Sequence, residues 1–188
     1  METRKFKEIS TRGRVAFAVC CLENVMKKQN LLQNDPSEKT ILQQLWHFTT
    51  DNMALWELQI GELIPFVIME DVSYDVKDFG FFSLRMHDMF KAYYKKCYKY
   101  TLDIIDLIYN LGRTNLFITI NNDELKEASL PYLQKIIDLM MENHISMPDI
   151  DLFKKFPITE NNGWGREFTR EMVFENGNST VNTTINST

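Results

Sequence analysis

The spacing of apolar residues restricts the fold of this chain more than any other feature of its sequence. Apolar side chains recur every three or four positions in successive segments, which places them on one face of an α-helix. The first segment begins near Thr11, and its broad apolar face consists of Val15, Phe17, Ala18, Val19, Cys21, Leu22, Val25 and Met26. Only seven Gly and five Pro occur in 188 residues, so helices meet few interruptions. We therefore expect an all-α, mostly helical bundle folded as a single domain.

Local residue patterns predict where the next two helices begin. Asp35-Pro36-Ser37-Glu38 is typical of a capping box, with Asp35 as the cap and Pro36 at the first helical position. Thr50-Asp51 is expected to cap a third helix, and Pro65 disfavours its continuation.

Three later stretches are less regular. Residues 84–111 keep helical spacing until Gly112, which predicts one long helix, although the aromatic residues and Thr within 98–101 would favour a break. Residues 66–82 predict a connecting region that could contain a short helical turn. The β-branched and aromatic residues near 115–120 indicate at most a short extended segment without an obvious partner strand.

The last third of the chain changes character. Pro131 should open a helix, and Ser146 to Asp149 predict the cap of a short final one, so a helical domain is expected over residues 1–156. Residues 157–175 are predicted to be a partly anchored tail, held by Trp164, Phe168, Met172 and Phe174. Residues 176–188 are rich in Asn, Thr and Ser and predict a flexible, disordered tail.

No pattern of residues indicates catalysis, a cofactor or a metal. The three histidines that could act as a base or a ligand are scattered along the chain: His47, His87 and His144. The three cysteines are an odd number and include an adjacent pair, which does not suggest a disulfide framework: Cys20, Cys21 and Cys97. The charged N-terminus does not predict a secretion signal, and no apolar run approaches the roughly 18 residues of a membrane span, so we expect a cytoplasmic location.

Charge is distributed unevenly along the chain. Residues 51–90 hold two basic and eight acidic residues, a net charge of −6, whereas residues 1–50 have a net charge of +3. An acidic stretch repels nucleic acid and membrane phosphates but attracts a basic protein surface. The residues predicted to contact such a partner are Glu57, Glu62, Glu70, Asp71, Asp75 and Asp78.

The stretch from Arg12 to Glu23, together with Leu45-Trp46 and the segment around Trp56, resembles a family of small helical immunity proteins from bacterial polymorphic-toxin systems. The resemblance implies a cytosolic antidote that binds a cognate toxin domain, blocks it stoichiometrically and performs no chemistry itself. A toxin that cuts nucleic acid would present a basic surface, which would fit the acidic residues named above. We expect a monomer or a weak homodimer.

Two other function classes remain open. An enzyme could assemble its site from distant residues, with one of the three histidines as general base beside a carboxylate in a deep polar cleft. A helical transcription regulator would need a continuous basic face that includes Lys91, Lys95, Lys96 and Lys99. The overall charge of −5 and the lack of a larger group of basic residues argue against nucleic-acid binding.

Overall fold

The computed structural model describes residues 3–29, 35–50, 52–69, 80–114, 116 and 127–175, and every regular element among them is a helix. The α-helices are α1 (Thr11–Gln29), α2 (Pro36–Trp46), α3 (Met53–Gly61), α4 (Pro65–Met69), α5 (Leu84–Tyr94), α6 (Lys99–Arg113), α8 (Leu130–Glu142) and α9 (Arg170–Phe174). The 3-10 helices are η1 (Thr3–Phe6), η2 (His47–Thr49), η4 (Ile150–Phe153) and η5 (Asn161–Gly163). The predicted all-α fold is confirmed over these residues. None of these helices is both long and apolar enough to cross a membrane.

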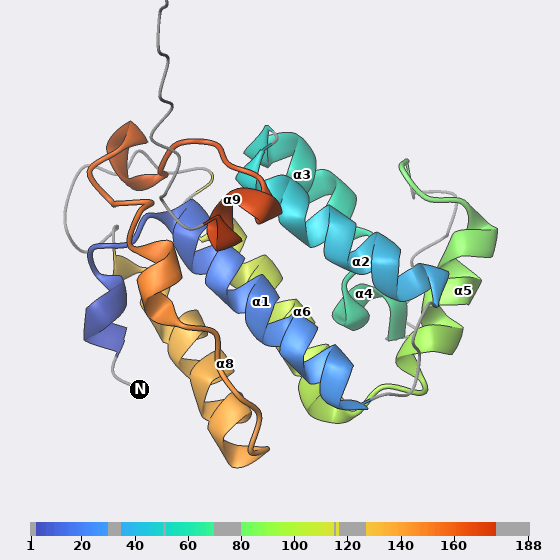
Figure 1. Cartoon of the computed structure of the whole chain (residues 1–188). Coiled ribbons are helices and arrows are strands. Elements are labelled where there is room, and N and C mark those ends of the chain that lie inside the picture. Colours follow the sequence, from blue (N-terminus) through green and yellow to red (C-terminus); the bar gives the residue numbers. More distant parts are fainter. Residues whose placement is uncertain are drawn as a thin grey trace, which may run out of the picture.

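Helix α1 lies at the centre of the bundle. It contacts α2, α6 and α8, and Figure 1 shows it crossing the middle of the molecule with α8 on one side, α2 on the other and α6 behind. Every residue from Thr11 to Glu23 is buried. A helix covered on all sides must be apolar around most of its circumference, which explains the unusually broad apolar face in the sequence.

Arg14 is completely buried in this bundle. Its Nε donates a hydrogen bond to the carbonyl oxygen of Phe6 at 3.0 Å, and its Nη2 donates to the carbonyl of Lys7 at 3.2 Å. Its Nη1 donates to the Ser129 hydroxyl at 3.0 Å. Burial lowers the pKa of Arg14 to about 10, so the side chain stays charged at neutral pH. Arg14 thus fastens η1 and the start of α8 to the central helix.

Arg12 makes the corresponding connection to the C-terminal part of the described chain. Its Nη1 donates to the carbonyl of Gly165 at 3.0 Å, and its Nε donates to the carbonyl of Phe48 at 3.3 Å. Burial lowers the pKa of Arg12. Arg12 and Arg14, both near the start of α1, therefore hold the segment before α1 and the segment around Gly165 in place through hydrogen bonds to backbone carbonyls.

The structure tests the predicted helix starts. Asp35 caps α2 as expected, since its carboxylate accepts the Ser37 amide at 2.9 Å. Asp149 likewise accepts the Asp151 amide at 3.0 Å, although the element that follows is the 3-10 helix η4. The cap of α3 is Asn52 rather than the predicted Thr50-Asp51 pair, because the Asn52 side chain accepts the amides of the following turn.

The prediction of one long helix over residues 84–111 is wrong, and the alternative break is correct. Helix α5 ends at Tyr94 and α6 begins at Lys99, with Tyr98 in an extended conformation between them. The buried Tyr94 hydroxyl donates to the carbonyl of Leu63 at 2.6 Å, which ties the end of α5 to the turn before α4. Tertiary contacts therefore redirect the chain at a run of aromatic residues with modest helix propensity.

The less regular stretches are only partly described. Residues 66–69 belong to helix α4, which begins at Pro65, so the predicted connecting region starts with a helical turn. Residues 70–79 lie outside the described residues. Leu116 is part of a turn, and the remainder of the extended segment predicted near 115–120 also lies outside them.

Residues 157–175 pack against the helical bundle. The Phe168 ring is buried and stacks on Phe156 with 3.6 Å between ring centroids. Val173 is also buried, whereas Met172 and Phe174 are exposed, contrary to the expectation that both anchor this segment. The reason is geometric: α9 is a short helix, and Val173 occupies the side that faces the bundle. The tail predicted for residues 176–188 lies outside the described residues.

Candidate functional site

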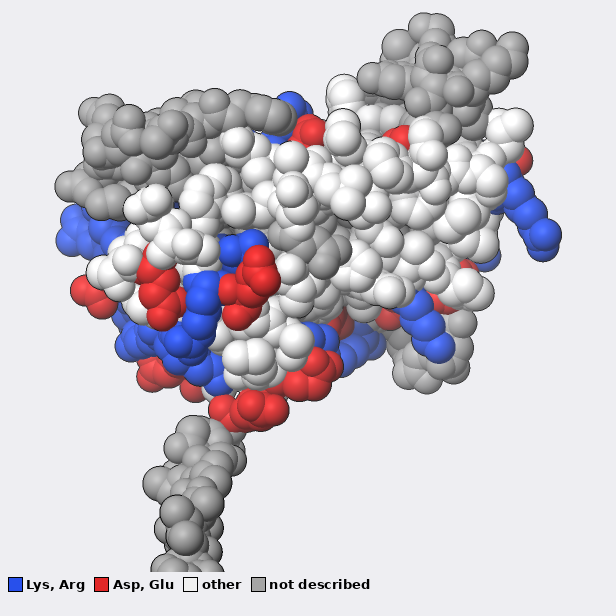
Figure 2. Space-filling model, turned by 90° about the horizontal axis from the view of Figure 1, so that it is seen from above, with Lys and Arg blue, Asp and Glu red and all other residues white. Residues whose placement is uncertain are grey.

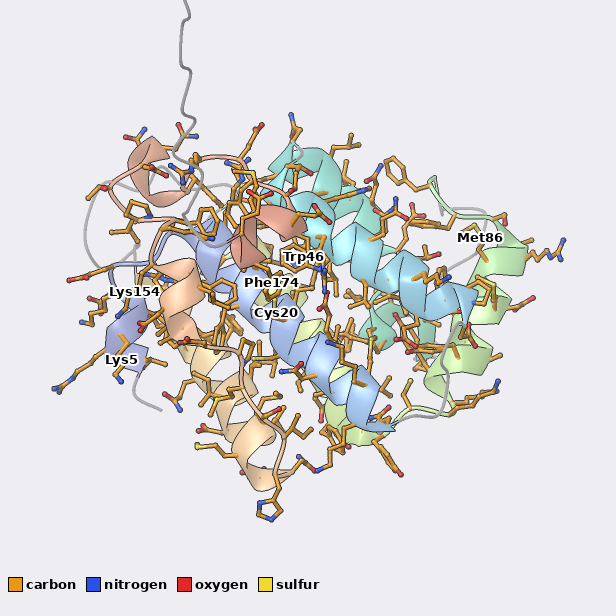
Figure 3. The ribbon with its side chains drawn as sticks, viewed as in Figure 1. Lys5, Cys20, Trp46, Met86, Lys154 and Phe174 are labelled. Carbon is orange, nitrogen blue, oxygen red and sulfur yellow. The ribbon has the colours of Figure 1, made fainter. Side chains whose placement is uncertain are left out.

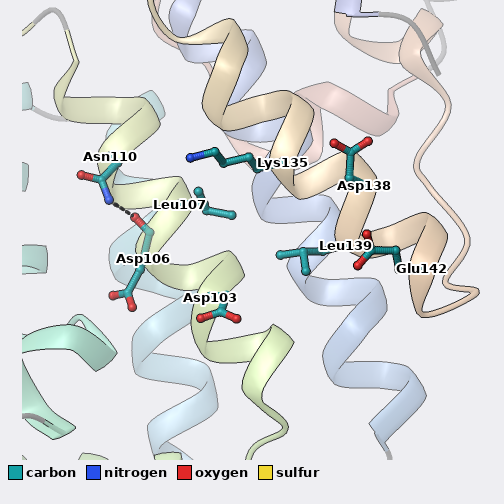
Figure 4. A pocket seen from close by; sticks show the side chains of 8 residues that line it. All are labelled: Asp103, Asp106, Leu107, Asn110, Lys135, Asp138, Leu139 and Glu142. Atoms are coloured by element: carbon teal, nitrogen blue, oxygen red, sulfur yellow. Dashed lines mark hydrogen bonds between the residues drawn. The ribbon is translucent and has the colours of Figure 1, made fainter.

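A hollow of about 450 Å³ lies between α6 and α8. It is lined by Asp103, Asp106, Leu107, Asn110, Lys135, Asp138, Leu139 and Glu142. Figure 4 shows the two helices side by side, with Lys135 reaching from α8 toward α6. Four carboxylates and one ammonium group give the lining residues a net charge of −3. We call this feature the acidic hollow.

The same residue spacing on both helices produces this hollow. In α6, Asp103 is followed three, four and seven positions later by Asp106, Leu107 and Asn110. In α8, Lys135 is followed at the same intervals by Asp138, Leu139 and Glu142. Such positions share one face of a helix, so each helix offers a leucine with polar side chains around it. The two leucines, Leu107 and Leu139, are partly buried and pack against the core.

Most of the carboxylates in the acidic hollow are held in place by bonds. The Lys99 ammonium group lies 2.5 Å from Asp103, and the amide of Gln134 donates to Asp138 at 2.7 Å. Asp106 accepts the backbone amide of Phe66 at 3.2 Å. No described residue bonds to the carboxylate of Glu142, which is exposed. The hollow therefore combines preorganised acids with one whose charge faces solvent.

A second hollow, of about 420 Å³, lies on the other side of α6. Its lining residues are Ile64, Phe66, Val67, Asp106, Tyr109, Asn110 and Arg113. Asp106 and Asn110 line both hollows, so the two adjoin across α6. The side chain of Phe66 is 60% exposed, which is unusual for an aromatic residue whose neighbours Pro65 and Ile68 are buried. Four of its seven lining residues, Asp106, Tyr109, Asn110 and Arg113, carry polar groups, and we call this feature the Phe66 hollow.

The two described residues from the predicted contact set have internal partners. The Glu57 carboxylate accepts the Tyr109 hydroxyl at 2.9 Å and lies 3.7 Å from the Arg113 guanidinium, and its side chain is only 14% exposed. Glu62 accepts the backbone amides of Gly80, Phe81 and Phe82 at distances between 2.7 and 3.2 Å. The other four members of the set, Glu70, Asp71, Asp75 and Asp78, lie outside the described residues.

A third hollow, of about 470 Å³, lies where α9 approaches α1. Figure 3 shows Cys20, Trp46 and Phe174 close together in this region, and Glu23 lies among the lining residues. The Glu23 carboxylate accepts the Trp46 indole N–H at 2.9 Å and two N–H groups of Arg170 at 2.8 and 2.9 Å. Burial alone would raise the pKa of Glu23, but the bonds from Arg170 and Trp46 lower it below its ordinary value.

The thiol of Cys20 at this hollow is unsuited to nucleophilic attack. Burial, reinforced by the Glu23 charge, raises the pKa of Cys20 to about 12, so the thiol stays protonated at neutral pH. Burial also raises the pKa of Cys97, to about 11. The third hollow is therefore best explained as the seam where an ion pair fixes α9 against α1.

The histidines proposed for an enzymatic site are dispersed. His47 begins η2, and His144 follows α8 with a φ of 51°. The Nδ1 atom of His87 lies 3.8 Å from the carboxylate of its neighbour Asp88. None of the three hollows described above is lined by a histidine. Within the described ranges, no group of three or more His, Cys, Asp or Glu side chains is placed to hold a metal ion.

An exposed apolar surface lies on a different part of the molecule. Leu55 and Leu58 of α3 are both exposed, and so is Phe81 in the turn that Glu62 binds. Figure 2 shows from above that acidic and basic side chains gather on one side, while a broad area on the other side is largely uncharged.

Sequence reasoning missed the acidic hollow. On a helix, paired acids such as Asp103 and Asp106 are typical of a solvated face, and Asp138 and Glu142 form no motif in the sequence. The signal that could have found them is the shared spacing around Leu107 and Leu139, but it requires knowing that these helices are neighbours. No protein-family model matches the sequence, and no curated protein and no solved structure matches the chain.

Proposed function

We propose that this chain is a non-enzymatic binding protein of the immunity type, which binds a cognate toxin domain with a basic surface and blocks it by occlusion. The observation that carries the proposal is the acidic hollow between α6 and α8. The resemblance of the N-terminal stretch to helical immunity proteins points the same way. The proposed contact surface includes Asp103, Asp106, Asp138 and Glu142.

Occlusion requires a shaped, charged surface on a rigid support, and the acidic hollow has these properties. Its acids come from two helices that pack against each other and against α1. The acids of this hollow, among them Glu142 whose carboxylate faces solvent, would attract a cationic surface and accelerate encounter with it. The leucines at its base would add apolar contact once water is excluded.

The residues that carry the N-terminal resemblance have a supporting role in this proposal. Arg12, Arg14 and Glu23 are buried and bonded within the chain. They fix the helices that display the acidic hollow, and we do not assign them to the contact surface.

The proposal predicts that a large secreted protein is encoded beside this chain, and it is tested by coexpressing the chain with the C-terminal domain of that protein. We expect the two to copurify and the chain to restore growth that the toxin domain suppresses. The double variant Asp138→Lys/Glu142→Lys should lose at least most of this protection. A matched control is Glu171→Lys/Glu175→Lys, which reverses two exposed acids at the same four-residue spacing, one in α9 and one directly after it.

The salt dependence of binding adds an independent readout. Because exposed charges are screened beyond about 8 Å at physiological ionic strength, the association rate of wild-type protein should fall as salt is raised. The association rate of the α8 charge-reversal variant should depend on salt less steeply. Copurification that is unchanged in that variant, with unchanged salt dependence, would remove the acidic hollow from the contact surface.

A further inference from the structure

We infer that Glu23 forms an arginine-binding site that the chain's own Arg170 occupies, so that α9 is a latch which an arginine side chain of another protein can displace. We use the name Glu23 site for the carboxylate of Glu23, the indole N–H of Trp46 and the ring of Phe174. The inference goes beyond the proposed function, because this site adjoins the third hollow rather than the acidic hollow.

The geometry of the Glu23 site selects a guanidinium group. The Nε and Nη2 atoms of Arg170 donate to different oxygens of the Glu23 carboxylate, at 2.8 and 2.9 Å. Two parallel bonds of this kind match the planar fork of arginine, which the ammonium group of lysine lacks. The guanidinium carbon of Arg170 also lies 5.2 Å from the centre of the Phe174 ring, a distance that permits a cation–π contact.

The carboxylate of Glu23 is held in place independently of Arg170. The indole N–H of Trp46 donates to the Oε1 atom of Glu23 at 2.9 Å, and Glu23 is only 8% exposed on the central helix α1. Trp46 is buried as well. If Arg170 departed, a fixed and buried carboxylate would lack a counter-charge, so it would favour another guanidinium group.

The third hollow provides room for an incoming side chain beside Glu23. Its volume is about 470 Å³, and Figure 3 shows Cys20, Trp46 and Phe174 close together in this region. Among its lining residues, two acids and two bases cancel while Arg170 is present, and their net charge becomes −1 when Arg170 leaves. An incoming arginine would restore neutrality, and its methylene groups would lie along the apolar walls that Pro148 and Leu152 provide.

The chain has a hinge directly before α9. Phe168 is fixed, because its ring stacks on Phe156 and its amide donates to the carbonyl of Thr49 at 3.1 Å. Thr169 follows in an extended conformation and is exposed. Rotation about the backbone of Thr169 would therefore move α9 away from α1 while Phe168 stays in place.

The contacts that keep α9 closed are modest. Within α9, Val173 is buried and the other residues are exposed. The Lys155 ammonium group donates to the carbonyl of Glu175 at 3.1 Å in an exposed setting. The side chain of Arg170 is 43% exposed, so solvent already reaches it. We therefore expect α9 to open by a local transition, before the bundle unfolds.

Arg170 has the advantage of being attached to the site that it occupies. A tethered ligand acts at an effective concentration in roughly the millimolar range, so a free arginine side chain competes weakly with it. Removing Arg170 should therefore raise the affinity of the Glu23 site for an external guanidinium group. The site would also be able to select a partner segment that presents an arginine beside apolar groups.

The inference is tested with acetyl-arginine amide as the probe and acetyl-lysine amide as the matched control. Binding to the full chain is followed by NMR through the indole N–H resonance of Trp46, which Trp46→Phe identifies. We expect the arginine probe to bind Arg170→Gln at least about tenfold more tightly than the wild type, because the internal competitor is gone. It should also bind this variant at least about tenfold more tightly than the lysine probe does.

A second readout follows α9 itself in the wild type. At concentrations that saturate the Trp46 shift, the arginine probe should move the methyl resonances of Val173 from those of a buried side chain toward those of an exposed one. The lysine probe at the same concentration should leave them unchanged. Two further variants serve as controls: Glu171→Gln should behave as the wild type, and Arg170→Gln/Glu23→Gln should lose the preference for arginine.

Each other result overturns the inference. A Trp46 resonance that responds to neither probe in Arg170→Gln would mean that no external arginine is bound, and equal responses would reject selection of guanidinium. If Arg170→Gln binds the arginine probe no more tightly than the wild type, α9 is not a latch. Val173 that stays buried in the saturated wild type would reject the latch too, and this readout decides if Arg170→Gln fails to fold. Toxin binding through the acidic hollow is unaffected by these outcomes, so the two proposals fail separately.

Discussion

Replacing Glu62 by Gln should loosen the turn that leads into α5 without weakening partner binding. The two carboxylate oxygens of Glu62 accept four hydrogen bonds from three consecutive amides, those of Gly80, Phe81 and Phe82. A glutamine keeps the shape of the side chain but offers one acceptor oxygen without full charge. At roughly 0.5 kcal/mol for each amide in this exposed setting, the change should cost local stability of about 1.5 kcal/mol.

The assay is hydrogen exchange at residues 80–82. A loss of about 1.5 kcal/mol corresponds to roughly tenfold faster exchange if these amides exchange by local opening. The control is Glu142→Gln, whose carboxylate no described residue binds, and exchange at 80–82 should not change in it. Unchanged exchange in Glu62→Gln, combined with weaker binding to the toxin domain, would make Glu62 a contact residue and refute the structural role.

Three further predictions concern the core. Phe168→Ala should destabilise the fold by about 3–4 kcal/mol because a buried ring is lost, whereas Phe174→Ala, at an exposed site, should cost under about 0.5 kcal/mol in urea unfolding. Gly112→Ala would place its Cβ 2.7 Å from an indole carbon and should cost about 1–3 kcal/mol, while Gly61→Ala meets only ordinary contacts at 3.5 Å and should keep the wild-type melting temperature. Folding lowers the pKa of Glu23 below its ordinary value of 4.5, so this carboxylate stabilises the fold at pH values above 4.5. The stabilisation is lost as the pH falls through the pKa of the folded state. Glu23→Gln should therefore flatten the curve of unfolding free energy against pH in that acidic range.

Local signals in the sequence predicted those parts of the fold that depend on neighbouring residues. The cap at Asp35 is an example, since the bond it makes spans only two positions. The end of α5 is the opposite case. It depends on the Tyr94 hydroxyl finding the carbonyl of Leu63, thirty-one positions earlier, and helical periodicity carries no trace of that contact.

The candidate site could be predicted only in its chemical character. Counting charges indicated an acidic protein surface, but it could not distinguish acids bonded inward from acids that face solvent. Glu57 and Glu62 stood out in the sequence and have internal partners. Asp138 and Glu142 did not stand out, because their significance depends on α8 lying beside α6.

The position of Arg12 has a consequence for how the protein is made. Arg12 lies at the start of α1, yet one of the acceptors of its guanidinium group is the carbonyl of Gly165, 153 positions later in the chain. Ribosomes deliver the N-terminal residues first, so the carbonyl of Phe48 is made early, but Arg12 lacks the Gly165 acceptor through most of translation. A nascent chain interrupted before residue 165 would lack both this acceptor and the segment that covers Arg12, so the start of α1 would stay exposed, which gives quality-control proteases a basis for removing incomplete copies.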